Sequence, residues 1–515
     1  MARGESQRGW PRIWGDHVVI LLVILAPWAF GSVDAWAECA LALGIGLVAI
    51  LATLESRKRR PGLARMPVPA LGLLGLVLLG VAQSSPLPES WLGRLAPTRA
   101  ALRGGLEPAE VDVVVGDSRP AVTRSSPTLS EDPDSTLFMS ARYAAAFALV
   151  QSLFLLGGGL GFLRRLGWTL AINAVALSLV AILQIASWNG HVLWLRATSV
   201  SAQVVGGPFF SHSHLADVLN LGLGFVLAAV LSQRAKTQGF LSESSGRGRS
   251  VWAIYCLGLI LTALFLTHSR AGLALAILAT LAVLLSGFPP RISLILAGSL
   301  AGLLLLFSSF MDSIPSFERA VSILDSTNEG YSARWELWRI ALNAWLEHPI
   351  WGLGLGSFAT AMSRYVVKDQ GNFSARCENE YLDMLTEGGV IGLGCLVVVV
   401  VSTLWLGVRA YRATRSKQER AWILGGLLGL SLIALHAVGD FGPHVAGVAI
   451  PMWVLAASIA RLGLAVPVGK TPAEADASPS APTRKTGPWC LLVPWWAASA
   501  LTLGLAGWAA IAAVT

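Results

Sequence analysis

The sequence is poor in charge. Asp, Glu, Lys and Arg make up only 13% of its 515 residues, whereas about a quarter of the residues in a soluble domain are charged. This shortage excludes an ordinary water-soluble domain. Hydrophobic residues account for 54% of the chain and occur in long continuous runs. Such runs are typical of transmembrane helices, and they differ from the alternating pattern of membrane β-strands.

Cysteine is also scarce, with five residues in the whole chain. Four of them lie in or beside apolar runs: Cys39, Cys256, Cys395 and Cys490. A thiol there acts as a small apolar side chain. Cys377 lies in a long polar segment and has no obvious partner, so the sequence gives no sign of a disulfide framework.

The apolar runs predict an all-α polytopic membrane protein with about 12–13 transmembrane helices. The candidate spans lie near residues 17–34, 36–54, 68–84, 138–160, 167–187, 214–232, 251–267, 271–287, 291–310, 388–407, 421–437, 445–461 and 489–513. Residues 1–37 also have features of a signal peptide. A second span follows at once, which favours a helical hairpin.

The basic residues predict the orientation of the chain. Most of the 38 Lys and Arg lie in alternate connections between spans, including residues 56–60 and 409–420. The positive-inside rule makes these connections cytoplasmic, and it places the N-terminus inside. Two long loops, 85–137 and 311–387, are then on the outer side.

This pattern divides the chain into three parts. Residues 1–462 form the main transmembrane domain, which carries both outer loops. Residues 463–488 are rich in Pro, Ala and Ser and form a cytoplasmic linker. Residues 489–515 add one C-terminal transmembrane helix.

Unusual polar residues gather on the outer side. Five stretches stand out, and each lies at the outer boundary of a span or in the outer loop: 206–217, 267–272, 332–358, 377–382 and 436–444. Because separate spans contribute to the same face, this pattern indicates one functional surface.

Two of these stretches supply arginines. Arg270 lies in a short outer connection, where it can extend to the membrane interface or contact an anion, and we favour the anion. Residues 332–347 have helical spacing and include Arg334, Trp338 and Arg339. Such a helix can lie on the membrane surface, or it can offer arginines to a phosphate and an aromatic face to a sugar.

Histidines and an aspartate are further candidates. His214 follows His212 at the start of a span, where it can cap the helix or orient a substrate. Two histidines alone do not make a metal site, and the sequence predicts none. His348 ends the helix of the outer loop, and His214 and His348 are both alternative bases. Asp440 either caps a loop or contacts substrate.

The block RWELWRIALNAWLEHPIWGLGLGSF, followed by NEYLDMLTEGGVIGLG, resembles the outer loop of the O-antigen ligase/polymerase family of bacterial membrane glycosyltransferases. THSRAG, PFFSHSHLAD and HAVGDFGPH are weaker matches, and the resemblance covers roughly residues 120–460. It implies a GT-C-type helical bundle in the bacterial inner membrane, with a large periplasmic loop that contains helices. The outer side is then the periplasm.

The resemblance also implies a reaction. The family transfers a glycan from undecaprenyl diphosphate to an acceptor hydroxyl at the periplasmic face, without a metal or cofactor and with inversion. Ligases attach the glycan to lipid A–core during lipopolysaccharide biosynthesis, and polymerases extend one lipid-linked repeat with another. The sequence does not separate the two. The expected partners are the lipid-linked glycan, a lipid or glycan acceptor and the bilayer, with no nucleic acid.

A transporter or flippase is the main alternative from another class. Proton-coupled carriers usually need ionisable groups near the middle of the membrane. Here the cores of the spans hold almost none, and Glu38, Arg142 and Asp217 all lie near the outer ends. The sequence therefore favours the transferase.

The expected chemistry assigns roles to particular residues. A diphosphate leaving group needs charge stabilisation, and the planar fork of arginine matches phosphate oxygens. We expect Arg270 and Arg334 to supply this charge. The family typically has histidine before its Asn-x-Tyr-Leu motif, whereas this sequence has Glu378, which is then the expected base. The expected substrate-binding residues are Arg339, His214, His348, Asn379, Tyr381, Trp338 and Asp440.

Glu378 has a second interpretation, as a helix start whose negative charge favours the helix dipole. Glu380, Asp383 and Glu387 follow it closely. For these three carboxylates we favour a solvated helix start rather than a catalytic role.

Overall fold

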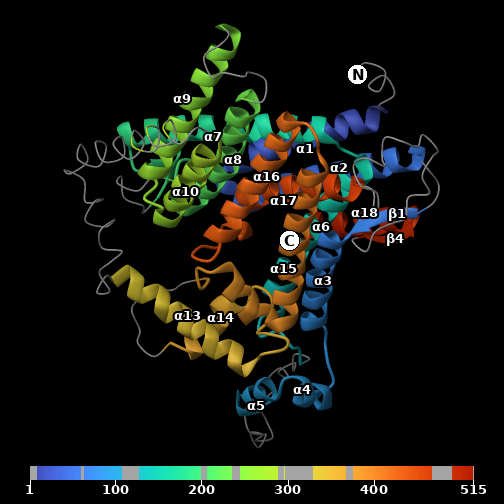
Figure 1. Ribbon diagram of the computed structural model, residues 1–515. Helices are drawn as coiled ribbons and strands as arrows, with labels where there is room; N and C mark the ends of the chain where they lie inside the picture. Colours follow the sequence, from blue (N-terminus) through green and yellow to red (C-terminus); the bar gives the residue numbers. More distant parts are fainter. Residues whose placement is uncertain are drawn as a thin grey trace, which may run out of the picture.

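The computed structural model is almost entirely helical (Figure 1). It describes residues 9–59, 63–106, 127–198, 206–234, 244–287, 291, 295, 298, 329–366, 375–466 and 490–513. Within these ranges, two short antiparallel strand pairs occur: β1 (Leu63–Pro67) with β4 (Cys490–Pro494), and β2 (His191–Val192) with β3 (Arg196–Ala197). The prediction of an all-α protein is confirmed.

Among the described residues, seven helices are long and apolar enough to cross a membrane. They are α1 (Trp10–Trp28), α2 (Ala35–Arg59), α6 (Pro133–Leu156), α7 (Leu160–Ala186), α8 (His212–Arg234), α15 (Glu380–Ala413) and α17 (Ala446–Ala465). The other apolar helices are α3 (Val68–Ser84), α9 (Ser244–Leu266), α10 (Arg270–Gly287), α16 (Lys417–His436) and α18 (Trp495–Ala512). The chain is therefore a multi-pass membrane protein, and the predicted span 291–310 lies outside the residues described in full.

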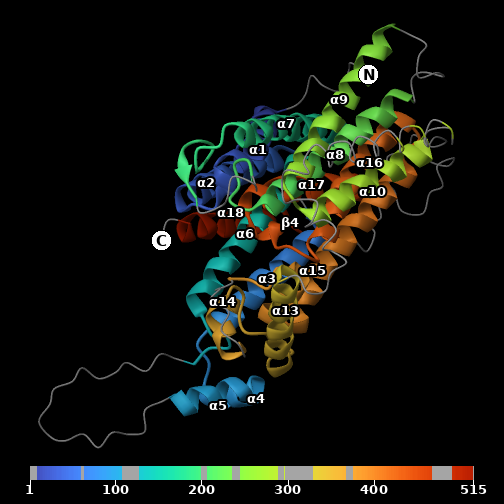
Figure 2. The same ribbon diagram turned by 90° about the vertical axis from the view of Figure 1, so that its left-hand side faces the viewer.

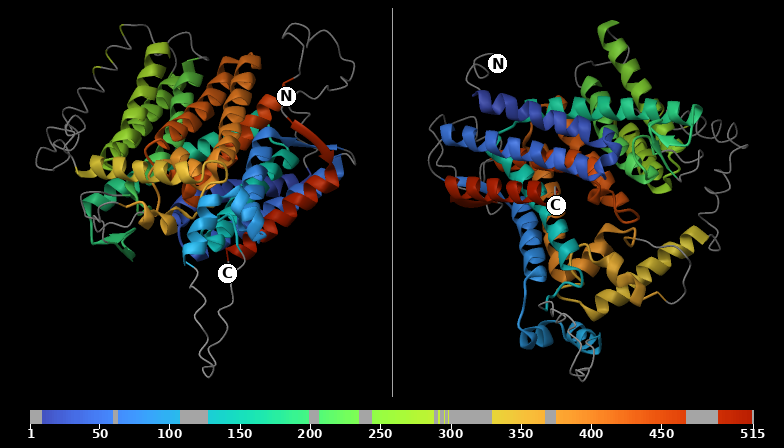
Figure 3. Two further views of the ribbon diagram at one scale, coloured as in Figure 1. Left: turned by 90° about the horizontal axis from the view of Figure 1, so that it is seen from below. Right: turned by 180° about the vertical axis from the view of Figure 1, so that it is seen from behind.

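The polar loops also contain helices. The first long loop contains α4 (Glu89–Leu95) and α5 (Pro97–Leu106), and the second contains α13 (Glu329–Glu347) and α14 (Phe358–Ala361). All four lie at one end of the long helices (Figure 2). Seen from behind, α13 extends away from the main bundle on that same side (Figure 3). The helix predicted over 332–347 is confirmed.

The contact between α8 and α16 determines where the polar groups lie. A Cβ atom added to Gly224 would lie 2.4 Å from the carbonyl oxygen of Gly425 and 2.8 Å from the backbone nitrogen of Gly429. The glycines therefore let the two backbones touch, as small residues do in membrane helix pairs. Two turns further along this antiparallel pair, Asp217 of α8 meets His436 of α16.

Candidate active site

His436 lies at the centre of a buried polar group at the ends of α8 and α16. Its Nδ1 is 2.7 Å from Oδ1 of Asp217, and its Nε2 is 3.1 Å from Oγ of Ser269. All three side chains are buried. An ionised carboxylate can only accept, so Nδ1 donates to Asp217. When the ring is neutral, Nε2 accepts from the Ser269 hydroxyl, and its lone pair is directed at that hydroxyl.

Ser269 connects this group to the arginine predicted from the THSRAG stretch. It precedes α10, and its Oγ accepts a hydrogen bond from the backbone N–H of Gly272 at 3.4 Å. Arg270 is the first residue of α10 and is exposed. The structure therefore places Arg270 one residue from a contact of His436, where the helix N-terminus also favours anions.

Asp440 and His214 lie on the other side of the same group. His214 Nε2 is 3.8 Å from Oδ1 of Asp440, and the His214 ring packs edge-on against Phe441. Burial, together with the nearby Asp217 carboxylate, raises the pKa of Asp440 to about 7. This carboxyl group can therefore hold or release a proton near neutral pH.

Arg334 and Glu378 come together at the surface above this group. The Nε–H of Arg334 donates to Oε2 of Glu378 at 2.6 Å. Their side chains are 47% and 34% exposed, so a ligand can reach both. The charge of Arg334 also acts on Asp440. Arg334 and Glu378 therefore meet in the structure, whereas the predicted convergence of Arg270 with this pair stays a prediction.

The backbone at Glu378 is left-handed, with φ 55°. This conformation is rare for a residue with a long side chain. The next residue, Asn379, caps α15 by accepting from the backbone N–H groups of Tyr381 and Leu382. The Tyr381 hydroxyl donates to the carbonyl of Ala434 at 2.7 Å, which fixes the start of α15 on α16.

A groove of about 1060 Å³ lies between α13 and α15. Four of the residues predicted to bind substrate line it: Trp338, Arg339, Asn379 and Tyr381. Arg339 is also paired with Glu336 on the same helix, with Nε and Oε2 3.0 Å apart. The groove has the aromatic and cationic lining that the sequence predicted, and substrate binding there stays a prediction.

His348 lies in a different polar group. Its Nε2 is 3.8 Å from Oε1 of Glu131, which also pairs with Arg364. Burial lowers the pKa of His348. This group joins the two outer loops to each other, and the structure does not bring His348 into contact with Arg334 or Glu378.

The expectation of a solvated acidic helix start is wrong for the three carboxylates after Asn379. Glu380, Asp383 and Glu387 are all buried. Glu380 Oε2 lies 2.7 Å from Nδ1 of His444. Arg376 lies 4.0 Å from Asp383 and 3.8 Å from Glu387. The local pattern missed this burial because distant segments cover these side chains: the outer loop covers Asp383 and Glu387, and the α16–α17 connection covers Glu380.

The glycine-rich turn after His348 is the part of the loop that covers Glu387. The Glu387 carboxylate accepts from the backbone N–H groups of Gly356 and Phe358 at 2.8 and 3.1 Å. Gly352 has φ 71°, and its Cβ would lie 2.3 Å from the Glu387 carbonyl oxygen. Gly354 and Gly356 also have positive φ, so the three glycines let the chain turn tightly over Glu387.

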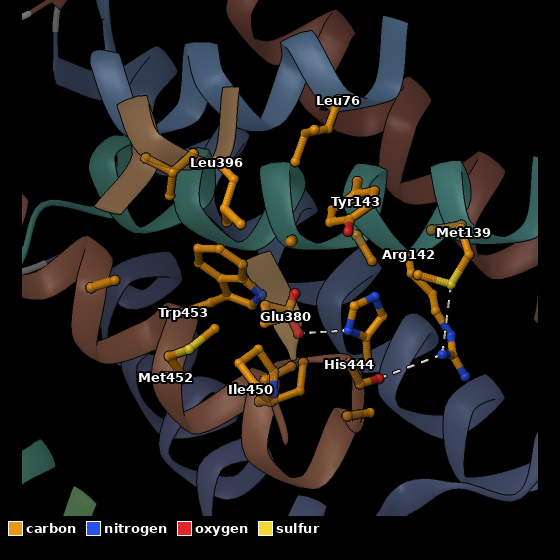
Figure 4. A pocket seen from close by; sticks show the side chains of 18 of the residues that line it. Leu76, Met139, Arg142, Tyr143, Glu380, Leu396, His444, Ile450, Met452 and Trp453 are labelled. Carbon is orange, nitrogen blue, oxygen red and sulfur yellow. Dashed lines mark hydrogen bonds and ion pairs between the residues drawn. The ribbon is translucent and has the colours of Figure 1, made fainter. Parts of the chain in front are cut away.

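An apolar cavity of about 180 Å³ lies beneath this network (Figure 4). Its lining comes mainly from α2, α6, α15, α17 and α18. Leu76, Leu396 and Trp453 are among its apolar side chains. One end is polar, where Glu380 bonds His444 (Figure 4) and Arg142 pairs with Glu38. The cavity suits an amphiphile with an apolar tail and a charged head.

Asp217, His436 and Asp440 could in principle hold a metal ion, since their ligand atoms lie within 4.8 Å of one another. However, both ring nitrogens of His436 already make hydrogen bonds, to Asp217 and to Ser269. A metal ion would have to replace at least one of them. The expectation of a metal-independent site stays a prediction.

Ser269 and His436 lie in two of the polar stretches at the outer boundary, but the sequence predicted no role for either residue. The hydrogen bonds of His436 span 219 residues to Asp217 and 167 to Ser269. No local spacing encodes such contacts. The available signal was the glycine content of the two facing spans, which indicated that they pack closely.

Comparison with known protein families gives one match. The family described as O-antigen ligase matches residues 255–397. The matched part includes Arg270, Arg334 and Glu378, and it confirms the resemblance found in the motifs. No curated protein matches the chain.

Proposed function

Because residues 255–397 match the family described as O-antigen ligase, we propose that the chain transfers a glycan from undecaprenyl diphosphate to an acceptor hydroxyl. The reaction takes place at the periplasmic face of the inner membrane, with the N-terminus in the cytoplasm. The acceptor is lipid A–core for a ligase, or a second lipid-linked repeat for a polymerase. The reaction inverts the anomeric carbon and needs no metal.

The observation that carries this proposal is the meeting of Arg334 and Glu378 above the buried Asp217–His436–Asp440 group. A diphosphate can take the place of the Glu378 carboxylate on the Arg334 guanidinium, which binds phosphate oxygens as a planar fork. Arg270 adds a second cation at the start of α10. Cations held in place act on the charge that develops as the leaving group departs.

The apolar cavity supports a lipid-linked donor. Its volume of about 180 Å³ takes only part of a polyprenyl chain. A polyprenyl tail that enters the cavity leaves lipid rather than water, so packing against the cavity wall, not the hydrophobic effect, selects the tail. Arg142 at the polar end lies beside His444 and Glu38, near the start of the helices that carry the site.

The direct test is the glycan profile of a deletion strain on a lipopolysaccharide gel. Loss of all long chains with accumulation of lipid-linked polymer identifies a ligase, and capping of the core by a single repeat identifies a polymerase. An unchanged profile together with failed uptake or flipping of a solute rejects the proposal in favour of a transporter or flippase.

Complementation of the deletion strain tests the arginines. Arg334→Lys keeps the charge but loses the planar fork, so we expect a drop in long-chain product of at least tenfold, about 1.4 kcal/mol. Arg270→Ala should abolish it. Lys417→Ala, on an exposed residue at the start of α16, is the matched control and should restore wild-type chains. Each variant needs wild-type amounts of protein in the membrane.

A further inference from the structure

The proposed reaction needs a group that takes the proton from the acceptor hydroxyl. Glu378 occupies the position where the family usually has histidine. In this structure its carboxylate is held by Arg334 at 2.6 Å, at the surface. When the diphosphate binds Arg334, it competes with Glu378 for the same guanidinium. The carboxylate is therefore placed beside the leaving group, whereas a base is needed on the opposite side of the anomeric carbon in an inverting reaction.

His436 has the geometry of a base. Its Nδ1 donates to Asp217 at 2.7 Å, which fixes the ring and the tautomer, and its Nε2 accepts from the hydroxyl of Ser269 at 3.1 Å. A histidine that a buried carboxylate orients toward a hydroxyl is a recurrent arrangement for proton abstraction. All three side chains are buried.

Charged and titratable groups face His436 from each neighbouring segment. They are Asp217, His212 and His214 from α8, Arg334 from α13 and Asp440 from the α16–α17 connection, and His268 of the α9–α10 connection acts on His212. Asp217 is the one in direct hydrogen-bond contact. Among these charged groups, Asp217 therefore acts most directly on the His436 ring.

Ser269 provides the route from the surface to His436. The serine itself is buried, but the next residue, Arg270, is exposed at the start of α10. The serine hydroxyl can pass a proton to Nε2 while it receives one from a hydroxyl bound beside Arg270. Alternatively, a change of serine rotamer lets the acceptor hydroxyl contact Nε2 itself.

We propose that His436 is the general base of the transfer reaction, that Ser269 relays the proton, and that Asp217 is the positioning residue. This inference rests on the proposed function. As the acceptor oxygen bonds to the anomeric carbon, the bond from that carbon to the diphosphate oxygen breaks, and its electron pair leaves with the diphosphate. The acceptor proton moves to Nε2 of His436 directly or through Ser269, and Asp217 stabilises the imidazolium.

The experiment uses the full-length protein in proteoliposomes, with an undecaprenyl-diphosphate-linked oligosaccharide and either acceptor. General base catalysis contributes about 10²–10⁴-fold, so His436→Gln should lower kcat by that factor with little change in KM for the donor. Asp217→Asn should lower kcat less and shift the pH–rate profile. Ser269→Ala should lower kcat, and Ser269→Thr should restore it. Donor binding and thermal unfolding are measured for every variant.

The outcomes separate the two proposals. If the wild-type protein transfers no glycan to either acceptor, the proposed function fails. If it is active, and His436→Gln keeps full kcat while Glu378→Gln loses the pH dependence, then Glu378 is the base and this inference is wrong. If His436→Gln does not fold, the pH profiles of the Asp217 and Ser269 variants decide. Profiles identical to that of the wild type overturn the inference.

Discussion

The buried carboxylate of Glu387 offers a test of how the outer loop is held on the helical bundle. It accepts from the backbone N–H groups of Gly356 and Phe358 at 2.8 and 3.1 Å. Arg376 lies 3.8 Å away, and the carboxylate side chain is only 3% exposed. Glu387→Ala removes the acceptor from two backbone donors and leaves the buried guanidinium with one carboxylate fewer.

The size of the effect follows from these contacts. Removing one partner of a buried ion pair costs about 3–5 kcal/mol. Hydrogen bonds to charged groups contribute roughly 1.5–3 kcal/mol each. Glu387→Gln keeps an acceptor oxygen and the shape of the side chain but loses the charge. We therefore expect a loss of about 3–5 kcal/mol for the alanine variant and about half of that for the glutamine variant.

Equilibrium unfolding of the full-length protein in mixed micelles, followed by tryptophan fluorescence, measures this difference. Glu336→Ala is the control, because Glu336 pairs with Arg339 on the exposed side of α13 and should matter little. If Glu387→Ala unfolds at the same denaturant concentration as the control, Glu387 does not hold the loop and the reasoning is refuted.

The pH dependence, the apolar cavity and the helix packing give three further expectations. Since burial raises the pKa of Asp440 from 3.8 to about 7, the folded state favours the protonated form, and stability falls as pH rises through this window. Asp440→Asn should therefore make the free energy of unfolding depend less on pH between 3.8 and about 7. Leu396→Trp should raise the KM of long-tailed donors more than that of short-tailed ones. Gly224→Val, facing the Gly425 carbonyl, should lower melting temperature and transfer rate, whereas Gly258→Val, which meets no atom within 4 Å, should change neither.

The helices could be predicted because their signal is local. The predicted span 68–84 coincides with α3, and the prediction over 332–347 lies within α13. The predicted positions of the helix ends were less accurate where a helix continues into polar sequence. For example, α15 begins at Glu380, whereas the apolar run begins near residue 388. Backbone hydrogen bonds continue the helix through these buried polar residues, and hydropathy does not register those bonds.

The site could be predicted in part. Arg334 and Glu378 meet as expected, since each lies in a motif of the outer loop. The burial of Glu387 was missed because its donors, Gly356 and Phe358, lie about thirty residues earlier. The pairing of Asp217 with His436 depends on the register of two distant spans, which a single sequence does not specify.

The buried carboxylates and the exposed ion pair are linked through the backbone at Glu378. A left-handed residue other than glycine costs about 1–2 kcal/mol, so both of its neighbours must be held. Asp383 accepts from the backbone N–H of Cys377 at 3.0 Å, and Asn379 begins α15 as its cap. These contacts fix the peptide on each side of Glu378 and direct its carboxylate to Arg334. Asp383, which is buried behind Glu378, therefore helps to position Arg334 at the surface, although Asp383 does not contact Arg334 itself.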